Sequence, residues 1–185
     1  MHTLKFRLAE RKDIPELLDL INTAYRVNNE DSWTNESNLV QGDRINALQV
    51  DEFIQLQQLE NMPVQLLIVE KTNQSEEGIL GCIGLTYTDL DVEIGTFCIA
   101  SEWQNAGYGK KVLQAAELYA LKHDPSLQSV SIWVLDLRHE LIQFYERRGF
   151  QKTGKIEPYP IDANVGVPVV DLKLLHMQKE AKRNF

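Results

Sequence analysis

A glycine-rich turn at the start of a helix is the strongest chemical signal in the sequence. Gly107-Tyr108-Gly109 follows an apolar run that ends near Ile99, and two lysines and an amphipathic helical pattern come after it. The first N–H groups of a helix lack a backbone partner and carry a partial positive charge, and glycine lets a ligand approach the chain closely. Together these features predict a phosphate-binding site.

The pattern around this turn narrows the kind of phosphate site. The P-loop pattern GxxxxGK[ST] is absent, and the dinucleotide pattern GxGxxG lacks its third glycine. Gln104 to Gly109 instead follows Q/R-x-x-G-x-G/A. In this it resembles the GCN5-related N-acetyltransferases (GNAT), in which the turn holds the pyrophosphate of acetyl-CoA. The alternative for these glycines is an ordinary strand-to-helix turn.

A second segment carries the same resemblance. Glu140 to Gly154 contains the aromatic pair Phe144-Tyr145 and then a Gly149-Phe150 step, which is similar to the helix and strand that follow the turn in GNAT proteins. The likeness covers nearly the whole chain and is most specific from Glu93 to Gly154. It implies the GNAT fold, an α/β architecture with a central mixed, largely antiparallel, twisted sheet of about seven strands flanked by helices on both faces.

The resemblance also implies where acetyl-CoA binds. Its pantetheine arm would pair with the strand at Phe97 to Ile99 like an additional strand, and a backbone N–H there would point at the thioester oxygen. The expected cofactor-binding residues are Phe97, Cys98, Ile99, Gln104, Asn105, Ala106, Gly107, Tyr108, Gly109 and Lys110.

Glu93 is the candidate base, because an amine must lose its proton before it attacks a thioester. It interrupts an apolar strand whose alternation predicts Glu93, Gly95, Phe97 and Ile99 on one face. The resemblance to histone-acetylating GNAT members, which have a glutamate at this offset from the glycine turn, implies the base role, and burial would raise its pKa toward neutrality. The alternative is an edge glutamate that faces solvent or pairs with an arginine.

Tyr145 is the candidate acid. It matches the tyrosine that GNAT members place near the thioester sulfur, and a phenol can protonate a departing thiolate. The alternative is a core aromatic on the same helix face as Leu141 and Phe144.

The acceptor side is implied by the family's use of the first two helices, their loop and the loop before the last strand. The conspicuous residues of these segments are Tyr25, Trp33, Arg44 and Tyr159. Tyr25 and Trp33 could wall a pocket or simply cover the edge of the core, and Arg44 could grip a carboxylate. Acidic residues in the same loop would attract a cationic amine. A polyamine, an aminoglycoside, an amino acid and a peptide N-terminus remain open as acceptors.

Apolar periodicity places these residues on the elements of one domain, 1–185. Strands are predicted at residues 3–9, 64–70, 79–87, 92–99, 130–135, 150–153 and 169–177, and a proline-containing loop at 157–168. Helices are predicted from a capping box of Asp13 and Glu16, from a cap at Asp51 to just before Pro63, and over 107–122 and 139–148. Sequential strands before a strand–helix–strand unit indicate a mixed sheet with helices on both faces.

Composition excludes several other classes. Nineteen Lys and Arg against 27 Asp and Glu give a net charge of -8, which argues against nucleic-acid binding. No apolar stretch is long enough to span a membrane, and no His or Cys spacing suggests a metal. Cys82 and Cys98 are expected to be buried free thiols, which suits a cytoplasmic protein, and a homodimer is compatible with the resemblance.

The sequence therefore predicts an N-acetyltransferase. The acetyl group of acetyl-CoA would pass to a primary amine of a small molecule or peptide by direct attack in a ternary complex. Two alternatives stay open: a non-catalytic acyl-CoA-binding module, and transfer of a longer acyl group, for which Arg138 is the nearby cation.

Overall fold

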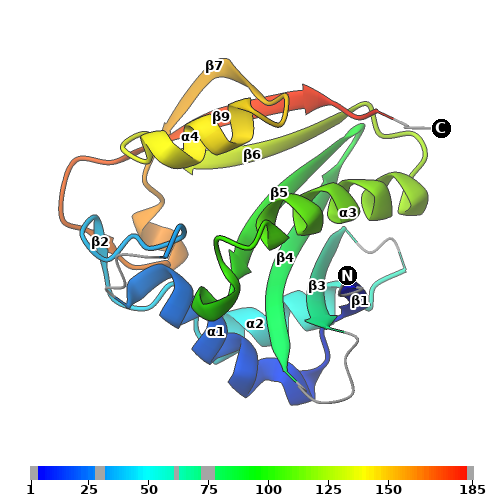
Figure 1. Cartoon of the computed structure of the whole chain (residues 1–185), viewed down its shortest axis with the longest axis horizontal. Helices are drawn as coiled ribbons and strands as arrows, with labels where there is room; N and C mark the ends of the chain where they lie inside the picture. Colours follow the sequence, from blue (N-terminus) through cyan, green and yellow to red (C-terminus); the bar gives the residue numbers. More distant parts are fainter. Residues whose placement is uncertain (1–3, 28–31, 61–62, 72–77, 183–185) are drawn as a thin grey trace.

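A seven-stranded sheet with helices on both sides organises the chain (Figure 1). The computed structural model describes residues 4–27, 32–60, 63–71 and 78–182. Their elements are β1 (Leu4–Leu8), α1 (Ile14–Arg26), β2 (Val40–Gln41), α2 (Ala47–Leu56), β3 (Val64–Lys71), β4 (Ile79–Thr88), β5 (Asp91–Ile99), α3 (Tyr108–His123), β6 (Ser129–Leu135), α4 (His139–Glu146), β7 (Gln151–Pro158), β8 (Val167–Pro168) and β9 (Lys173–Glu180).

The strand order in the main sheet is β1-β3-β4-β5-β6-β9-β7. Of its pairings, β5 with β6 is parallel and the others are antiparallel. The short β4–β5 connection makes a hairpin, whereas the parallel neighbours β5 and β6 are joined through α3, as parallel strands require. The expected mixed, largely antiparallel sheet is confirmed.

The helices cover both faces of the sheet because the inner strands are apolar on both sides. Leu67 of β3 and Ile83 of β4 pack in the cluster that contains α3 and α4 residues. Leu66 of β3 and Cys82 of β4 pack in a second cluster with α1 and α2. The alternation of side chains along each strand assigns them to the two faces, so the prediction of helices on both faces is also confirmed.

The two central strands pair only over part of their length. β5 and β6 are in register from Asp91–Ser129 to Ile94–Ile132, and beyond this point they diverge (Figure 1). Opposite β4, the register of β5 shifts between Cys82 and Gly84, and Thr96 has a φ of 44°. These features are those of a β-bulge, which re-aims side chains and leaves backbone groups unpaired.

The bulge corrects one expectation about β5. Ile94 and Ile99 both pack in the α3 cluster although they are five positions apart, which in a regular strand places them on opposite faces, and Cys98 packs in the α1 cluster. The extra residue inverts the alternation, so Phe97 and Ile99, which both pack on the α3 side, do not share the face of Glu93 as strict alternation predicts.

The first helix starts where predicted, with Asp13 at its N-cap position and Ile14 as its first residue, but the predicted capping box is wrong. Asp13 and Glu16 form no capping box; the Asp13 carboxylate instead accepts from Arg7 at 2.6 Å, and Glu16 accepts from the backbone N–H of Ile79 at 2.8 Å. The second predicted start is wrong: α2 begins at Ala47 after the N-cap residue Asn46, whose side chain accepts from the backbone N–H of Gln49 in a capping box, so Asp51 lies inside the helix.

Two boundaries near the C-terminus also differ from the prediction. β7 extends to Pro158, into the predicted loop, and β9 begins at Lys173 rather than at residue 169. Residues 167–168 instead form the short strand β8, which pairs with β2.

Candidate active site

A cavity of about 640 Å³ lies where β5 and β6 diverge. It is lined by most of the residues that the sequence singled out: Tyr25, Trp33, Arg44, Glu93, Phe97, Cys98, Ile99, Gln104, Asn105, Gly107, Gly109, Lys110, Tyr145 and Tyr159. Two others lie outside its lining, since the Tyr108 ring packs in the core and Ala106 is exposed. The fold thus brings the glycine turn, the candidate base and acid, and the acceptor-side residues to one space.

The glycine turn leaves open space at the start of α3. Gly107 has a φ of 77°, a conformation that glycine adopts without strain, and a Cβ built there would meet no atom within 4 Å. A Cβ at Gly109 would lie 3.8 Å from Phe144 Cζ, an ordinary contact. The unpaired N–H groups of the first helical turn and Lys110 are suited to a pyrophosphate, so the residues present fit acetyl-CoA.

Trp33 is tied to this turn rather than to the acceptor side of the cavity. Its backbone N–H donates to Gln104 Oε1 at 2.6 Å, and its indole N–H donates to Asn105 Oδ1 at 2.7 Å. Gln104 also donates to the carbonyl of Ile99 at 2.7 Å. The side chains of Gln104 and Asn105 are therefore engaged with the protein, and they hold the loop after α1 against the turn before α3.

Buried Arg138 fixes the same loop from the other side. Its guanidinium donates to the carbonyls of Trp33 and Thr34 and pairs with Glu140. With these partners Arg138 positions the loop. It is not free to bind the carboxylate of a longer, acidic acyl group.

Glu93 is half-buried beside Trp133 on the neighbouring strand β6. The indole N–H of Trp133 donates to Glu93 Oε2 at 3.1 Å. Burial raises the pKa of Glu93, the Trp133 hydrogen bond opposes the rise, and the charges of Asp91 and Glu157 add to it. No atom lies within 4 Å of a Cβ built at Gly95, so the strand is open next to this carboxylate.

Tyr145 is buried against two other aromatic rings and still borders the cavity. Its ring meets Phe144 edge-on at a centroid distance of 5.1 Å and Phe150 at 5.5 Å. Burial raises the pKa of its hydroxyl, so the phenol keeps its proton across the working pH range. Among the described residues that hydroxyl has no hydrogen-bond partner. The ring itself packs in the core, which is the alternative role considered for it in the sequence analysis.

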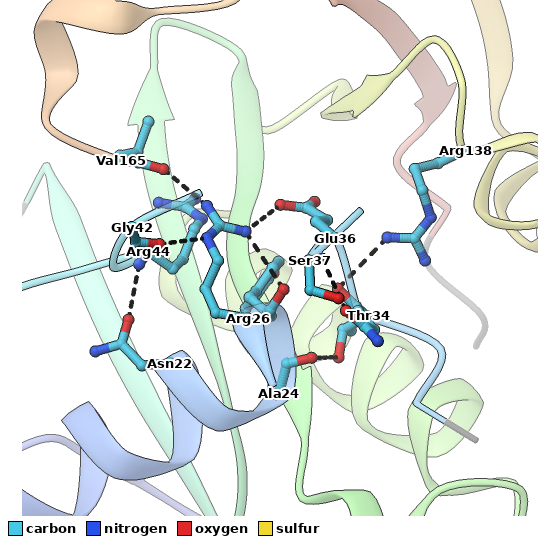
Figure 2. Close-up of polar contacts among 12 residues, drawn as sticks. Asn22, Ala24, Arg26, Thr34, Glu36, Ser37, Gly42, Arg44, Arg138 and Val165 are labelled. Carbon is cyan, nitrogen blue, oxygen red and sulfur yellow. Dashed lines mark hydrogen bonds and ion pairs between the residues drawn. The ribbon is translucent and has the colours of Figure 1, made fainter. Parts of the chain in front are cut away.

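The acceptor side is assembled by Arg26 at the end of α1 (Figure 2). Arg26 pairs with Glu36 at 2.7 Å, both side chains being largely buried, and donates to the carbonyls of Gly42 and Val165. It thereby joins the loop between α1 and α2 to the loop before β9. A buried pair of this kind needs its extra hydrogen bonds to offset desolvation, and here it has them.

Arg44 and the two tyrosines lie within this assembly. Tyr25 donates its hydroxyl to the carbonyl of Phe97 at 3.0 Å, and Tyr159 donates to Val165 at 2.8 Å. The Arg44 guanidinium lies 5.3 Å from the centre of the Tyr25 ring. The backbone N–H of Arg44 donates to Asn22 Oδ1 on α1 at 2.7 Å (Figure 2).

The sequence interpretation missed the residues that act through these contacts. They are Asn22, Arg26 and Trp133; Arg138 has a different role in that interpretation, as a cation for a longer acyl group, and Glu36 belongs there only to the acidic residues of its loop. Each partner is far away in the sequence or depends on a loop conformation, so spacing alone carries no signal for them. Trp133 is the exception, because a tryptophan among small apolar residues on a strand next to Glu93 could have suggested a donor.

Comparison with known proteins identifies the domain. Residues 64–152 match the family model of the acetyltransferase (GNAT) domain. The chain carries a GNAT domain. This is the domain of N-acetyltransferases, which are acyltransferases, and the match spans β3 to the start of β7, including the glycine turn and Glu93. No curated protein matches the sequence at a significant level.

Solved structures share the whole fold of this GNAT protein. Spermidine N-acetyltransferase from Vibrio cholerae, in complex with CoA and spermine, aligns with a TM-score of 0.68 at 17% identity over 96% of this chain and 95% of that one. An N-acetyltransferase from Staphylococcus aureus Mu50 aligns with a TM-score of 0.66 at 13% identity over 97% of this chain and 99% of that one. At such identities the likeness shows the fold.

The described residues contain neither a metal-binding cluster nor a membrane-spanning helix. No group of three or more His, Cys, Asp or Glu side chains in this part of the chain is arranged to hold a metal. None of the helices described has both the length and the apolarity needed to cross a bilayer.

Proposed function

We propose that this GNAT protein transfers the acetyl group of acetyl-CoA to a primary amine by direct attack in a ternary complex. The observation that carries the proposal is the single cavity that Glu93, Tyr145, Gly107 and Gly109 all line. A phosphate-binding turn, a half-buried carboxylate and a buried phenol are the groups that amine acetylation needs. Acetyl-CoA supplies the thioester carbonyl that the amine attacks.

The proposed proton transfers follow from the surroundings of the two side chains. Glu93, with its raised pKa, takes a proton from the ammonium form of the acceptor, and the neutral amine then forms the C–N bond. Tyr145 keeps its proton until the C–S bond breaks and gives it to the departing sulfur, and the second proton of the attacking nitrogen, released as the amide forms, restores the phenol. The bulge at Thr96 supports a backbone N–H donor for the carbonyl oxygen.

A non-catalytic acyl-CoA-binding module is the alternative reading of the same turn. Such a module needs neither a carboxylate with a raised pKa nor a phenol at the cavity wall. Transfer of a longer, acidic acyl group has less support, because Arg138 already binds Glu140 and two loop carbonyls.

The test is incubation with acetyl-CoA and a panel of primary amines, with the N-acetylated product detected by mass spectrometry. Mass detection avoids interference from Cys82 and Cys98, which a thiol reagent would report together with released CoA. We expect an acetylated amine and stoichiometric CoA. Tight binding of acetyl-CoA without product from any amine would instead identify a binding module.

A further inference from the structure

The acceptor end of the cavity contains a cation that has no acidic partner among the residues that the structure describes. Arg44 lines the cavity and stacks over Tyr25, and among the described residues its guanidinium contacts no carboxylate. The other cations of the lining, Lys110, Arg147 and Arg148, lie at the glycine-turn side, where Arg148 covers the ring of Phe144 and Phe144 contacts the Gly109 position.

Glu36 borders the cavity but is not free to neutralise Arg44. Its carboxylate accepts from Arg26 at 2.7 Å, and the two side chains are only 12% and 9% exposed (Figure 2). Arg26 is held further by the carbonyls of Gly42 and Val165. Moving Glu36 to Arg44 would leave Arg26 buried and unpaired, which is costly.

The backbone of Arg44 is fixed in place by α1. Asn22 Oδ1 accepts from the N–H groups of Arg44 and Ile45 at 2.7 and 3.1 Å, and Asn22 Nδ2 donates to the carbonyl of Ile45 at 3.0 Å. Three hydrogen bonds from one side chain thus set the position from which Arg44 enters the cavity, so the guanidinium has only its own torsions to order on binding a ligand.

The opposite charge lies farther along β5. Glu93 is four residues before Phe97, whose carbonyl accepts from the hydroxyl of Tyr25, the ring under Arg44. Four residues of a regular strand span about 13 Å. The bulge at Thr96 shortens this stretch of β5, but the cavity still offers a carboxylate and a guanidinium at separated positions. A guanidinium binds a carboxylate through two parallel hydrogen bonds, and this geometry favours it over other partners.

We propose that the acceptor is an amine that also carries a carboxylate, with Arg44 binding the carboxylate while the amine lies toward Glu93. The inference rests on the proposed function and makes Arg44 a determinant of acceptor specificity. A polyamine fits this end poorly, because it would bring a second ammonium group to an uncompensated guanidinium.

The experiment compares acceptors that differ only in the carboxylate. Lysine is paired with cadaverine and 4-aminobutyrate with propylamine, because both acids carry an amine separated from the carboxylate by several bonds, and spermidine is added as a polyamine. We expect wild-type kcat/KM to favour the acid of at least one pair by about 10-fold or more, the discrimination typical of one charge-assisted contact.

Arg44→Gln tests the assignment. It should raise KM for that acid and remove the preference, while kcat/KM for the amine without the carboxylate changes less than about two-fold. Arg44→Lys should keep part of the preference, since it retains charge without the fork. Lys122→Gln, on the exposed end of α3, removes one positive charge elsewhere and is the matched control.

Calorimetric titration with the amino acids keeps this inference distinct from the proposed function. Amino-acid binding that Arg44→Gln abolishes would support the carboxylate site even if no acceptor were acetylated, and the absence of product would then overturn only the transfer. A wild-type preference for spermidine or for the amines without carboxylates, or an equal loss for both members of a pair in Arg44→Gln, would overturn the inference and leave the acetyl transfer standing. The inference would also be overturned if no amine that carries a carboxylate were bound or acetylated.

Discussion

At the scale of single residues, Glu93 is held between opposing influences. Burial favours its neutral form, and the indole N–H of Trp133 favours its carboxylate. A carboxylate with a raised pKa is a stronger base than one in water, while the hydrogen bond keeps enough of it ionised to act. Because the pKa of Glu93 is raised in the folded protein, its charged form is disfavoured by folding. Its carboxylate therefore does not stabilise the fold at neutral pH.

Glu93→Gln should therefore lower kcat/KM without lowering Tm at neutral pH. The deficit should be greatest, on the order of 10²-fold, where the acceptor is still an ammonium ion, and it should narrow as pH approaches the pKa of the amine. The measurement is a pH–rate profile of both proteins with two amines of different pKa. A ratio that is independent of pH and equal for both amines would remove Glu93 from the proton transfer.

Trp133→Phe should move the acidic limb of the pH profile to higher pH. The change removes a hydrogen bond that lowers the pKa of Glu93, so that pKa rises and the base is lost earlier as pH falls. A net hydrogen bond of about 1 kcal/mol corresponds to a shift of about 0.7 pH units. Glu93→Gln combined with Trp133→Phe is the control, since the shift should vanish without the carboxylate.

Tyr145→Phe keeps the packing against Phe144 and Phe150 and removes only the hydroxyl. We expect kcat to fall by about 10²-fold, with the affinity for acetyl-CoA nearly unchanged. Pre-steady-state product formation shows whether chemistry limits turnover. An unchanged rate of the chemical step would assign Tyr145 to the core alone.

At the scale of elements, the acceptor pocket depends on two loops that meet through β2 and β8. Gly166 lies at this contact with a φ of 97°, and a Cβ there would come within 2.7 Å of the Gln41 carbonyl and of Val40 Cγ1. Arg26 reaches the same place through the carbonyl of Val165. The contact between the two loops thus requires a residue with a positive φ and no side chain at position 166.

Gly166→Ala should loosen this contact and raise KM for the acceptor several-fold, with a loss of stability of about 1–2 kcal/mol. The affinity for CoA should change little, because the glycine turn is on α3. The control is Gly154→Ala on β7, which has a φ of 86° but no atom within 4 Å of the new Cβ. Equal effects of the two changes would show that backbone strain, not contact between the loops, is responsible.

The elements also show what a sequence can and cannot predict. The glycine turn, α3, α4 and the strand that contains Glu93 were predictable because apolar periodicity and turn residues are local signals. The bulge at Thr96 was not, since nothing in its residues marks the extra residue, and it inverted the face of Ile99. Asp13 resembled a helix cap, but Arg7 provided a stronger partner.

The residues of the site also fall into those that the sequence could predict and those that it could not. Glu93, Tyr145 and the glycine turn stand out by type and context, and the structure brings them to one cavity. Arg26 and Asn22 look like ordinary surface residues in the sequence, and Arg138 looks like a free cation; only the folded loops give these three their carbonyl or backbone N–H partners. Tertiary hydrogen bonds of this kind leave no periodic pattern.

At the scale of the whole molecule, the sheet consists of two parts that share only the short parallel pairing of β5 and β6. A cofactor bound between the diverging strands would contact β5, α3 and α4 at once. Ligand binding of this kind stabilises the native state in proportion to the logarithm of ligand concentration.

CoA at about 100 times its Kd should thus add about 2.7 kcal/mol and raise Tm by about 5–10 °C. Gly109→Glu should abolish the shift, because a side chain and a negative charge would enter the anion site. Gly109 is a cleaner position than Gly107, whose φ of 77° would add backbone strain. The Tm of the variant without CoA shows whether it still folds, and a normal shift in a folded variant would refute the site.

The strand order has a consequence for how the molecule is made. β9 lies between β6 and β7, so neither has its partner on that side until residues 173–180 have left the ribosome. The half of the sheet from β1 to β5 has all its internal pairings from residues 4–99, and it can form while synthesis continues. The part of the sheet that contains Trp133 is therefore completed last. The edges of β6 and β7 stay open from the synthesis of each strand until β9 emerges, and a chain shortened before β9 would be prone to aggregate.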